Sequence, residues 1–223
     1  MADCRSQQND NKRGKFITLE GPDGSGKTTQ TEKLVALLTS YGLEVVRTRE
    51  PGGVSIAEKL RAILLDPVNI ISARTELMLY AAARAQHTSE LIMPSLLAGK
   101  WVVCERYTHA SLAYQGYGRN LDKDLIGRLN DIATDGLRPD LTFLLDIDVE
   151  KGLERVRGSS RELDRMETET IEFHKRVRAG YLKIADMDER VFLIDSSGVS
   201  ENTHRQIKEV IEKRMPAGKS YKQ

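Results

Sequence analysis

One short stretch near the N-terminus, residues 15–29, constrains the fold of this chain more than any other. Strand-forming residues run into a glycine-rich turn, and a helix-like segment follows. Gly21, Gly26, Lys27 and Thr28 satisfy the phosphate-loop pattern G-x-x-x-x-G-K-[ST], in the strand–loop–helix context that the pattern requires. The alternative is an ordinary glycine-rich turn before a helix, and the agreement of pattern and context argues against it.

The chemistry of this loop is that of a nucleoside triphosphate site. Glycines let backbone N–H groups converge, and the N-terminus of the following helix adds positive potential. Lys27 can reach the terminal phosphates, and the hydroxyl of Thr28 can bind a Mg²⁺ ion. We predict that the triphosphate is bound by the following residues: Gly21, Pro22, Asp23, Gly24, Ser25, Gly26, Lys27, Thr28 and Thr29.

Charge and cysteine content narrow the class of protein. The 223 residues carry 34 basic and 33 acidic side chains, a net charge of +1, which gives no overall attraction to nucleic acid or membranes. The two cysteines, Cys4 and Cys104, lie in different settings, so no structural disulfide is expected. No apolar run approaches the length of a membrane span, and we expect the polar residues 1–13 not to act as a secretory signal. We therefore expect a cytoplasmic enzyme with no nucleic-acid or membrane partner.

The order of apolar runs predicts a doubly wound α/β fold with a parallel sheet and the phosphate loop after its first strand. We expect a disordered tail at 1–13, one domain at 14–215 and a second tail at 216–223. The expected strands are 16–19, 43–48, 101–104, 141–145 and 191–194. The expected helices are 27–40, 54–65, 72–98 kinked or divided at Pro94, 121–134, 149–156, 166–186 and 201–214. In helix 121–134 we expect Leu125, Leu129 and Ile132 to face the core.

Two strand ends offer a carboxylate for the metal ion. Glu105 follows one strand, and Asp146 follows another. Mg²⁺ at a phosphate site takes one or two carboxylates, often through water. We favour Glu105 because Arg106 is its neighbour, which would place a metal ligand beside a phosphate-binding group. Asp148 fits better as the N-cap of the helix after it.

Arginines gather where ligands of a parallel sheet should bind. One triphosphate does not need so many, whereas two anions brought together for phosphoryl transfer do. The segment around Gly158 is basic and flexible in composition, so we expect a lid at about 155–168. Tyr80 and Arg84 share one helix face and would suit a planar base; a core-facing tyrosine is the alternative. The arginines are Arg49, Arg84, Arg106, Arg157, Arg161 and Arg165.

Six motifs together resemble the thymidylate kinase family in order and spacing, over about residues 15–200. They are EGPDGSGKTT at 20–29, TREPGG at 48–53, YAAARAQH at 80–87, ERY at 105–107, AYQG at 113–116 and RELDRME at 161–167. The resemblance implies a P-loop nucleoside-monophosphate-kinase fold with a lid. It also implies that ATP phosphorylates dTMP to dTDP with Mg²⁺, in the synthesis of dTTP, and that the enzyme is a homodimer.

The resemblance implies roles residue by residue. The catalytic groups would be Lys27, Arg106, Arg157, Arg161 and Asp23, and the metal ligands Thr28 and Glu105. Asp23 would lie near the acceptor sugar or the metal ion, and Tyr114 would crowd the 2′ position of the sugar and favour deoxyribose. The acceptor site would comprise Asp23, Arg49, Pro51, Tyr80, Arg84, Arg106, Ser111, Tyr114 and Gln115.

Three details refine this resemblance. The bacterial-type members have an arginine-rich lid and no arginine within the phosphate loop, and Gly24 fits that type. The family usually has Asp-Arg where this chain has Glu105 and Arg106, so direct metal contact at 105 is an open question. The resemblance raises the expected frequency of a cis bond between Glu50 and Pro51 above the general rate for X–Pro bonds.

Two other functions compete on the residues alone. One is a related kinase for a different small acceptor, such as another nucleoside monophosphate or a sugar acid. The other is a GTP-driven switch, which needs a guanine-reading Asn-Lys-x-Asp after a late strand. The Asn-Lys pair here, Asn11 and Lys12, precedes the first strand and lacks the Asp. We therefore discount the switch.

Overall fold

The computed structural model describes residues 13–160 and 162–215. Most of the N-terminal tail, the tail at 216–223 and Arg161 lie outside the described residues. Arg13, which we assigned to the N-terminal tail, is described: its guanidinium pairs with Asp140 at 3.3 Å. The described part of the chain therefore includes one residue of the segment that we assigned to the tail.

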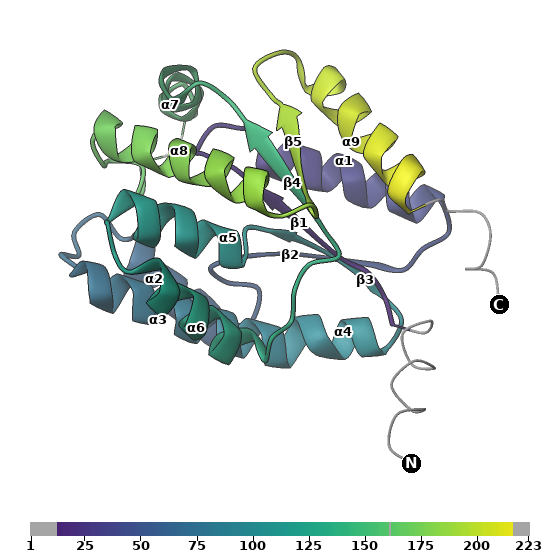
Figure 1. Cartoon of the computed structure of the whole chain (residues 1–223), viewed down its shortest axis with the longest axis horizontal. Coiled ribbons are helices and arrows are strands. Elements are labelled where there is room, and N and C mark those ends of the chain that lie inside the picture. Colours follow the sequence, from purple (N-terminus) through teal and green to yellow (C-terminus); the bar gives the residue numbers. More distant parts are fainter. Residues whose placement is uncertain (1–12, 161, 216–223) are drawn as a thin grey trace.

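A parallel sheet of five strands forms the centre of the described chain (Figure 1), in the order β2-β3-β1-β4-β5. This confirms the predicted fold class. Successive parallel strands need crossover helices, which is why helices cover both faces of the sheet. The strands are β1 (Phe16–Glu20), β2 (Val45–Arg49), β3 (Trp101–Glu105), β4 (Leu141–Asp146) and β5 (Val191–Asp195).

The helices lie close to the expected ranges, and two of them contain π-helical turns. One layer packs α1 and α9 on Ile17 and Leu19 of the sheet, and Figure 1 shows these two helices side by side. The opposite layer packs Ile92 and Leu96 on Phe16. The helices are α1 (Lys27–Ser40), α2 (Ser55–Leu65), α3 (Ala73–His87), η1 (Thr88–Ile92), α4 (Met93–Leu97), α5 (Thr108–Ser111), η2 (Leu112–Gly118), α6 (Lys123–Thr134), α7 (Val149–Arg157), α8 (Ile171–Met187) and α9 (Ser200–Arg214).

The expected helix 72–98 is divided near Pro94, which is one of the two outcomes predicted there. The π-helical segment η1 separates α3 from α4, and Pro94 occupies the first turn of α4. Proline has no N–H to donate, so the helix changes its hydrogen-bond spacing before it. The helix expected from Met166 begins only at Ile171, because Thr170 caps it through a bond from the N–H of Phe173.

The predicted inward face of α6 is wrong. Leu125 is 38% exposed and Ile132 is 78% exposed, whereas Ile126 and Asn130 are buried. The Oδ1 atom of Asn130 accepts a hydrogen bond from Arg84, and its Nδ2 atom donates to the carbonyl of Thr108. A polar side chain therefore takes a core position, and the helix is rotated relative to the leucine pattern.

The loops that follow β1, β2 and β3 all leave the same edge of the sheet, as the parallel pairing requires. Their backbones have special conformations. Gly21 and Gly26 have φ of 140° and 85°, the Glu50–Pro51 bond is cis, and Arg106 has φ of 65°. This edge is where the sequence places its ligand-binding residues. No described helix is long and apolar enough to cross a bilayer.

Candidate active site

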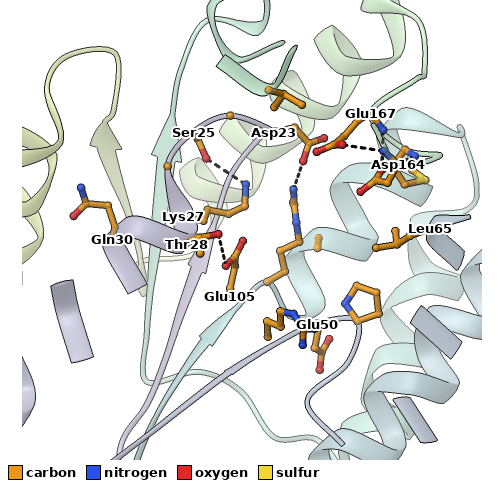
Figure 2. Close-up of a pocket in the computed structure, with 18 of the residues that line it drawn as sticks. Asp23, Ser25, Lys27, Thr28, Gln30, Glu50, Leu65, Glu105, Asp164 and Glu167 are labelled. Atoms are coloured by element: carbon orange, nitrogen blue, oxygen red, sulfur yellow. Dashed lines mark hydrogen bonds and ion pairs between the residues drawn. The ribbon is translucent and has the colours of Figure 1, made fainter. Parts of the chain in front are cut away.

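A single cavity of about 1160 Å³ lies at this edge and joins the phosphate loop to the loops after β2 and β3 (Figure 2). Pockets for one drug-sized ligand are roughly 300–1,000 Å³, so this one has room for two nucleotides. It brings together most of the predicted site residues. Among those described, the ones that do not line it are Gly21, Pro22 and Arg157.

The phosphate loop needs its glycines for two different reasons. Gly26 has open space around it but starts α1 in the left-handed conformation, with φ of 85°, which residues with a Cβ atom rarely adopt. A Cβ atom at Gly24 would lie 2.0 Å from the carbonyl oxygen of Gly152 in α7. The loop is thus packed against α7, and no arginine could occupy position 24 without displacing that helix.

Lys27 lies at the bottom of the loop, 5% exposed. Its Nζ atom donates to the carbonyl of Pro22 at 2.8 Å, to that of Gly21 at 3.1 Å and to the Oγ of Ser25 at 3.3 Å. Burial and the charge of Arg106 lower the pKa of Lys27 to about 8. The side chain is therefore an anion-binding group whose charge can change at moderately alkaline pH.

Thr28 and Glu105 meet across the cavity floor, as Figure 2 shows. The hydroxyl of Thr28 donates to Glu105 Oε2 at 2.9 Å. Asp146, the alternative metal ligand, instead forms an ion pair with Arg178, at 2.8 Å and 2.9 Å, and does not line the cavity. Asp148 caps α7 through the N–H groups of Glu150 and Lys151, as predicted.

The pair of Thr28 and Glu105 fits a Mg²⁺ ion by the chemistry of its donors. Both offer hard oxygen ligands, which Mg²⁺ prefers, and both face the space where triphosphate oxygens would lie. Among the described residues, no group of three or more His, Cys, Asp or Glu could hold a metal ion by itself. Mg²⁺ at a phosphate site commonly has few protein ligands and completes its shell with phosphates and waters.

Asp23, Arg106 and Tyr114 form a charged cluster between the two ends of the cavity. Asp23 forms an ion pair with Arg106, and Tyr114 donates its hydroxyl proton to Asp23 Oδ2 at 2.8 Å. Burial raises the pKa of Asp23, but Arg106 and Lys27 outweigh it and hold that pKa below its ordinary value. Burial raises the pKa of Tyr114 well above its usual range. Asp23 is therefore ionised and Tyr114 protonated at neutral pH.

Arg84 is buried and lines the cavity among the residues predicted to bind the acceptor. Its guanidinium donates to Glu50 at 2.7 Å, Ser111 at 2.9 Å, Asn130 at 2.5 Å and the carbonyl of Tyr107 at 3.0 Å. These bonds use four of its five N–H donors. Tyr80, one turn earlier on α3, also lines the cavity, as do Ser111 and Gln115.

Sequence reasoning missed Glu58 and Arg61 at the cavity, and it placed Arg155 only in the basic segment of the expected lid. Glu58 pairs with the predicted phosphate ligand Arg49 at 2.6 Å, and Arg61 donates to the carbonyl of Pro51 at 2.9 Å. Arg155 donates to the carbonyl oxygens of Ser196 and Ser197, at 3.1 Å and 3.2 Å. All three line the cavity. None belongs to a motif, although Glu58 and Arg61 share one face of α2 at a spacing of three residues, which could have indicated a polar lining.

The described arginines of the expected lid are placed differently from one another. Arg157 ends α7 and is exposed to solvent. Arg165 is buried, with Nε donating to the carbonyl of Leu64 at 2.8 Å and Nη1 paired with Glu76 at 2.7 Å. Arg165 therefore joins its segment to α2 and α3 and does not line the cavity.

Comparison with known proteins decides the family. The family model described as thymidylate kinase matches residues 19–207. The chain belongs to the thymidylate kinase family. It is 52% identical to the thymidylate kinase of Halothermothrix orenii over 197 residues, which cover 87% of this chain and 95% of the relative. It is 51% identical to that of Geotalea uraniireducens over 213 residues, which cover 92% of this chain and 100% of the relative.

A solved structure agrees with the family assignment. The crystal structure of thymidylate kinase from Ehrlichia chaffeensis superposes with a TM-score of 0.74 and 35% sequence identity, over 90% of this chain and 99% of that one. Both the sheet order and the phosphate loop described above therefore belong to a fold already seen in this family.

Proposed function

We propose that one part of the cavity binds the phosphoryl donor and another part binds the acceptor, so that the cavity performs the reaction of its family. The enzyme transfers a phosphoryl group from ATP to dTMP, giving dTDP, and uses Mg²⁺. One observation carries the assignment of roles. The phosphate loop and the pocket around Tyr80 and Arg84 line the same continuous cavity, so two anionic ligands can meet between them.

The donor half is the phosphate loop. Its backbone N–H groups and the start of α1 bind the phosphates of ATP. Lys27, already aimed into the loop, exchanges its bonds to loop carbonyls for phosphate oxygens. Thr28 and Glu105 hold the Mg²⁺ ion, whose chemistry is to neutralise charge on the phosphate oxygens.

The acceptor half comprises the loops after β2 and β3 and the helices α3 and η2. Tyr80 stacks on the base, and Arg84, Ser111 and Gln115 contact its edge. Arg49 and Arg106 hold the acceptor phosphate, and Pro51 lines the space around it. Tyr114 occupies the side of the sugar where a 2′-hydroxyl would lie.

Phosphoryl transfer then depends on positioning and charge. Arg106 is held by Asp23 and by the hydroxyls of Tyr114 and Tyr181, at 3.0 Å and 3.1 Å, so its guanidinium is fixed at the junction of the two halves. Pre-organised charge of this kind stabilises an in-line transition state without reorganisation. The lid at 155–168 adds Arg157 and Arg161 when it closes and excludes water.

We further propose that the enzyme acts as a homodimer in the cytoplasm. Large apolar side chains are exposed on three neighbouring helices (Figure 1), and such surfaces mark interfaces. The described cysteine, Cys104, is a buried free thiol, in keeping with a reducing compartment. The exposed residues on the helices are Ile56 and Ile63 in α2, Met78 in α3, and Leu125 and Ile132 in α6.

A turnover screen tests the acceptor assignment. Initial rates with ATP and Mg²⁺ are measured with dTMP, dUMP, UMP, CMP, AMP and shikimate. We expect dTMP to have the highest kcat/KM, because the acceptor pocket matches an imide base on a deoxyribose. A higher kcat/KM for any other acceptor would overturn the assignment. Lys27→Ala is the matched control, and should nearly abolish turnover with every acceptor.

A further inference from the structure

Glu76 lies in α3 beneath the acceptor pocket, and its side chain is completely buried. Its carboxylate accepts from Arg165 Nη1 at 2.7 Å and from Arg119, whose Nε is at 3.2 Å and Nη2 at 3.0 Å. It also accepts from Gln115 Nε2 at 2.8 Å. Nothing in the transfer chemistry described above uses this buried charge.

The charge of Glu76 fixes which way the amide of Gln115 points. Burial raises the pKa of Glu76, but the hydrogen bonds from Arg119 and Gln115 outweigh it and leave that pKa below its ordinary value. An ionised carboxylate accepts hydrogen bonds and cannot donate them. Gln115 must therefore turn its NH₂ group toward Glu76 and its Oε1 away from it. Gln115 lines the cavity, and no hydrogen bond among the described residues occupies that Oε1 atom.

Next to Gln115 Oε1, which is a hydrogen-bond acceptor, the pocket presents hydrogen-bond donors. Ser111 Oγ accepts from Arg84 Nη1 at 2.9 Å, so the proton of the serine hydroxyl is free to donate into the cavity. Arg84 keeps one N–H beyond its four bonds to the protein. A thymine or uracil ring offers the complementary edge, an N3–H donor beside a carbonyl acceptor. Cytosine offers the reverse, an N3 acceptor beside an amino donor.

We propose that Glu76 is a specificity-determining positioning residue, which fixes the amide of Gln115 so that the pocket accepts an imide base and rejects cytosine. The proposal deepens the proposed function and rests on it. Arg119 and Arg165 have a supporting role, since a buried carboxylate stays ionised only when it is paired. Without that charge, the amide of Gln115 can rotate and present its NH₂ group to the N3 atom of cytosine.

The test is Glu76→Gln, assayed by kcat/KM for dTMP, dUMP and dCMP. The new amide can donate to or accept from Gln115, so either orientation of Gln115 is satisfied. We expect the ratio of kcat/KM for dTMP over dCMP to fall by about tenfold, the effect of about one hydrogen bond. The ratio for dTMP over dUMP should not change, because these bases share the same imide edge. A loss of activity that is equal for all three acceptors would overturn the proposal.

Two further variants separate specificity from folding. Glu169→Gln is the matched control, because Glu169 pairs with Arg119 at 2.6 Å, and no described contact joins it to Gln115. It should leave the dTMP-to-dCMP ratio unchanged, and a fall as large as that of Glu76→Gln would contradict the proposal. If Glu76→Gln does not fold, Gln115→Met tests the inference instead, because it removes the hydrogen-bond acceptor Oε1. That variant should also lower the ratio, and an unchanged ratio would refute the inference.

The wild-type enzyme distinguishes this inference from the proposed function. If wild-type protein prefers an acceptor other than dTMP, the function fails and the inference with it. If wild-type protein prefers dTMP and the Glu76→Gln ratio stays constant, the function stands and only the role of Glu76 is refuted.

Discussion

The charge of Lys27 depends on whether its Nζ atom is protonated, and this charge acts within the phosphate loop. In the enzyme without ATP, burial and Arg106 hold the pKa of Lys27 at about 8, so its ammonium is charged at neutral pH and loses its proton as the pH rises. The neutral amine cannot attract phosphate oxygens. We therefore expect ATP binding to be coupled to the protonation of this residue.

We predict that the Kd for ATP rises about tenfold between pH 7 and pH 9, because binding requires a proton that Lys27 has lost in the free enzyme. Isothermal titration calorimetry over this range measures the effect. Lys27→Arg is the control, since a guanidinium stays charged and its Kd should stay nearly constant. Parallel pH curves for the two proteins would show that another group is responsible.

Single residues could be predicted from the sequence where a motif marks them. Lys27, Thr28 and Tyr80 lie in recognisable patterns, and the structure places all three around one cavity. Glu76 and Glu58 could not be predicted in this way. Their importance comes from partners in other elements, such as Gln115, 39 positions away, and no local pattern encodes a contact over that distance.

At the scale of elements, strand and helix positions followed closely from apolar periodicity, but helix faces did not. The leucine pattern of α6 indicated a core face that the structure exposes, because Asn130 turns inward to bind Arg84. The late start of α8 has a similar cause. Asp164 accepts from the N–H groups of Met166 and Glu167 and holds that segment in a turn. In both cases a polar side chain decides the geometry, and hydrophobic patterning does not detect it.

The lid that we propose at residues 155–168 contains arginines in different settings. Arg165 is bound to Glu76 and Arg157 is exposed at the end of α7, and Arg161 lies outside the described residues. We expect Arg161→Ala to lower kcat by about 10³ with little change in KM, because an arginine on the transferring group acts in the transition state.

Steady-state kinetics with saturating ATP and varied dTMP measures both constants for this variant. Arg205→Ala, on an exposed position of α9 outside the cavity and outside the proposed dimer surface, is the matched arginine control and should behave as wild type. A rise in KM with an unchanged kcat would mean that Arg161 contributes to ground-state binding alone.

At the scale of the whole molecule, the large apolar side chains exposed on α2, α3 and α6 do not belong to the hydrophobic core. A homodimer interface on these helices would bury them. Ile132 is 78% exposed and belongs to α6, which packs beside α3. We expect the wild-type protein to have twice the chain mass in sedimentation equilibrium, and Ile132→Glu to shift it toward the monomer, because a charge within an apolar interface is costly to bury.

Met187→Glu is the control for this experiment. Met187 is 74% exposed at the end of α8, away from the three helices, and its replacement should leave the dimer intact. A wild-type protein that stays monomeric at micromolar concentration would contradict the dimer.

We propose that the phosphoryl donor ATP and the acceptor dTMP occupy one continuous cavity at the same time. The most direct measurement is the Kd of a bisubstrate analogue, in which adenosine and thymidine are joined by a phosphate chain, determined by calorimetry. Linking the two ligands should make it bind about 10²-fold more tightly than ATP, and Lys27→Ala and Tyr80→Ala should each weaken it. An affinity equal to that of ATP, unaffected by Tyr80→Ala, would contradict the account.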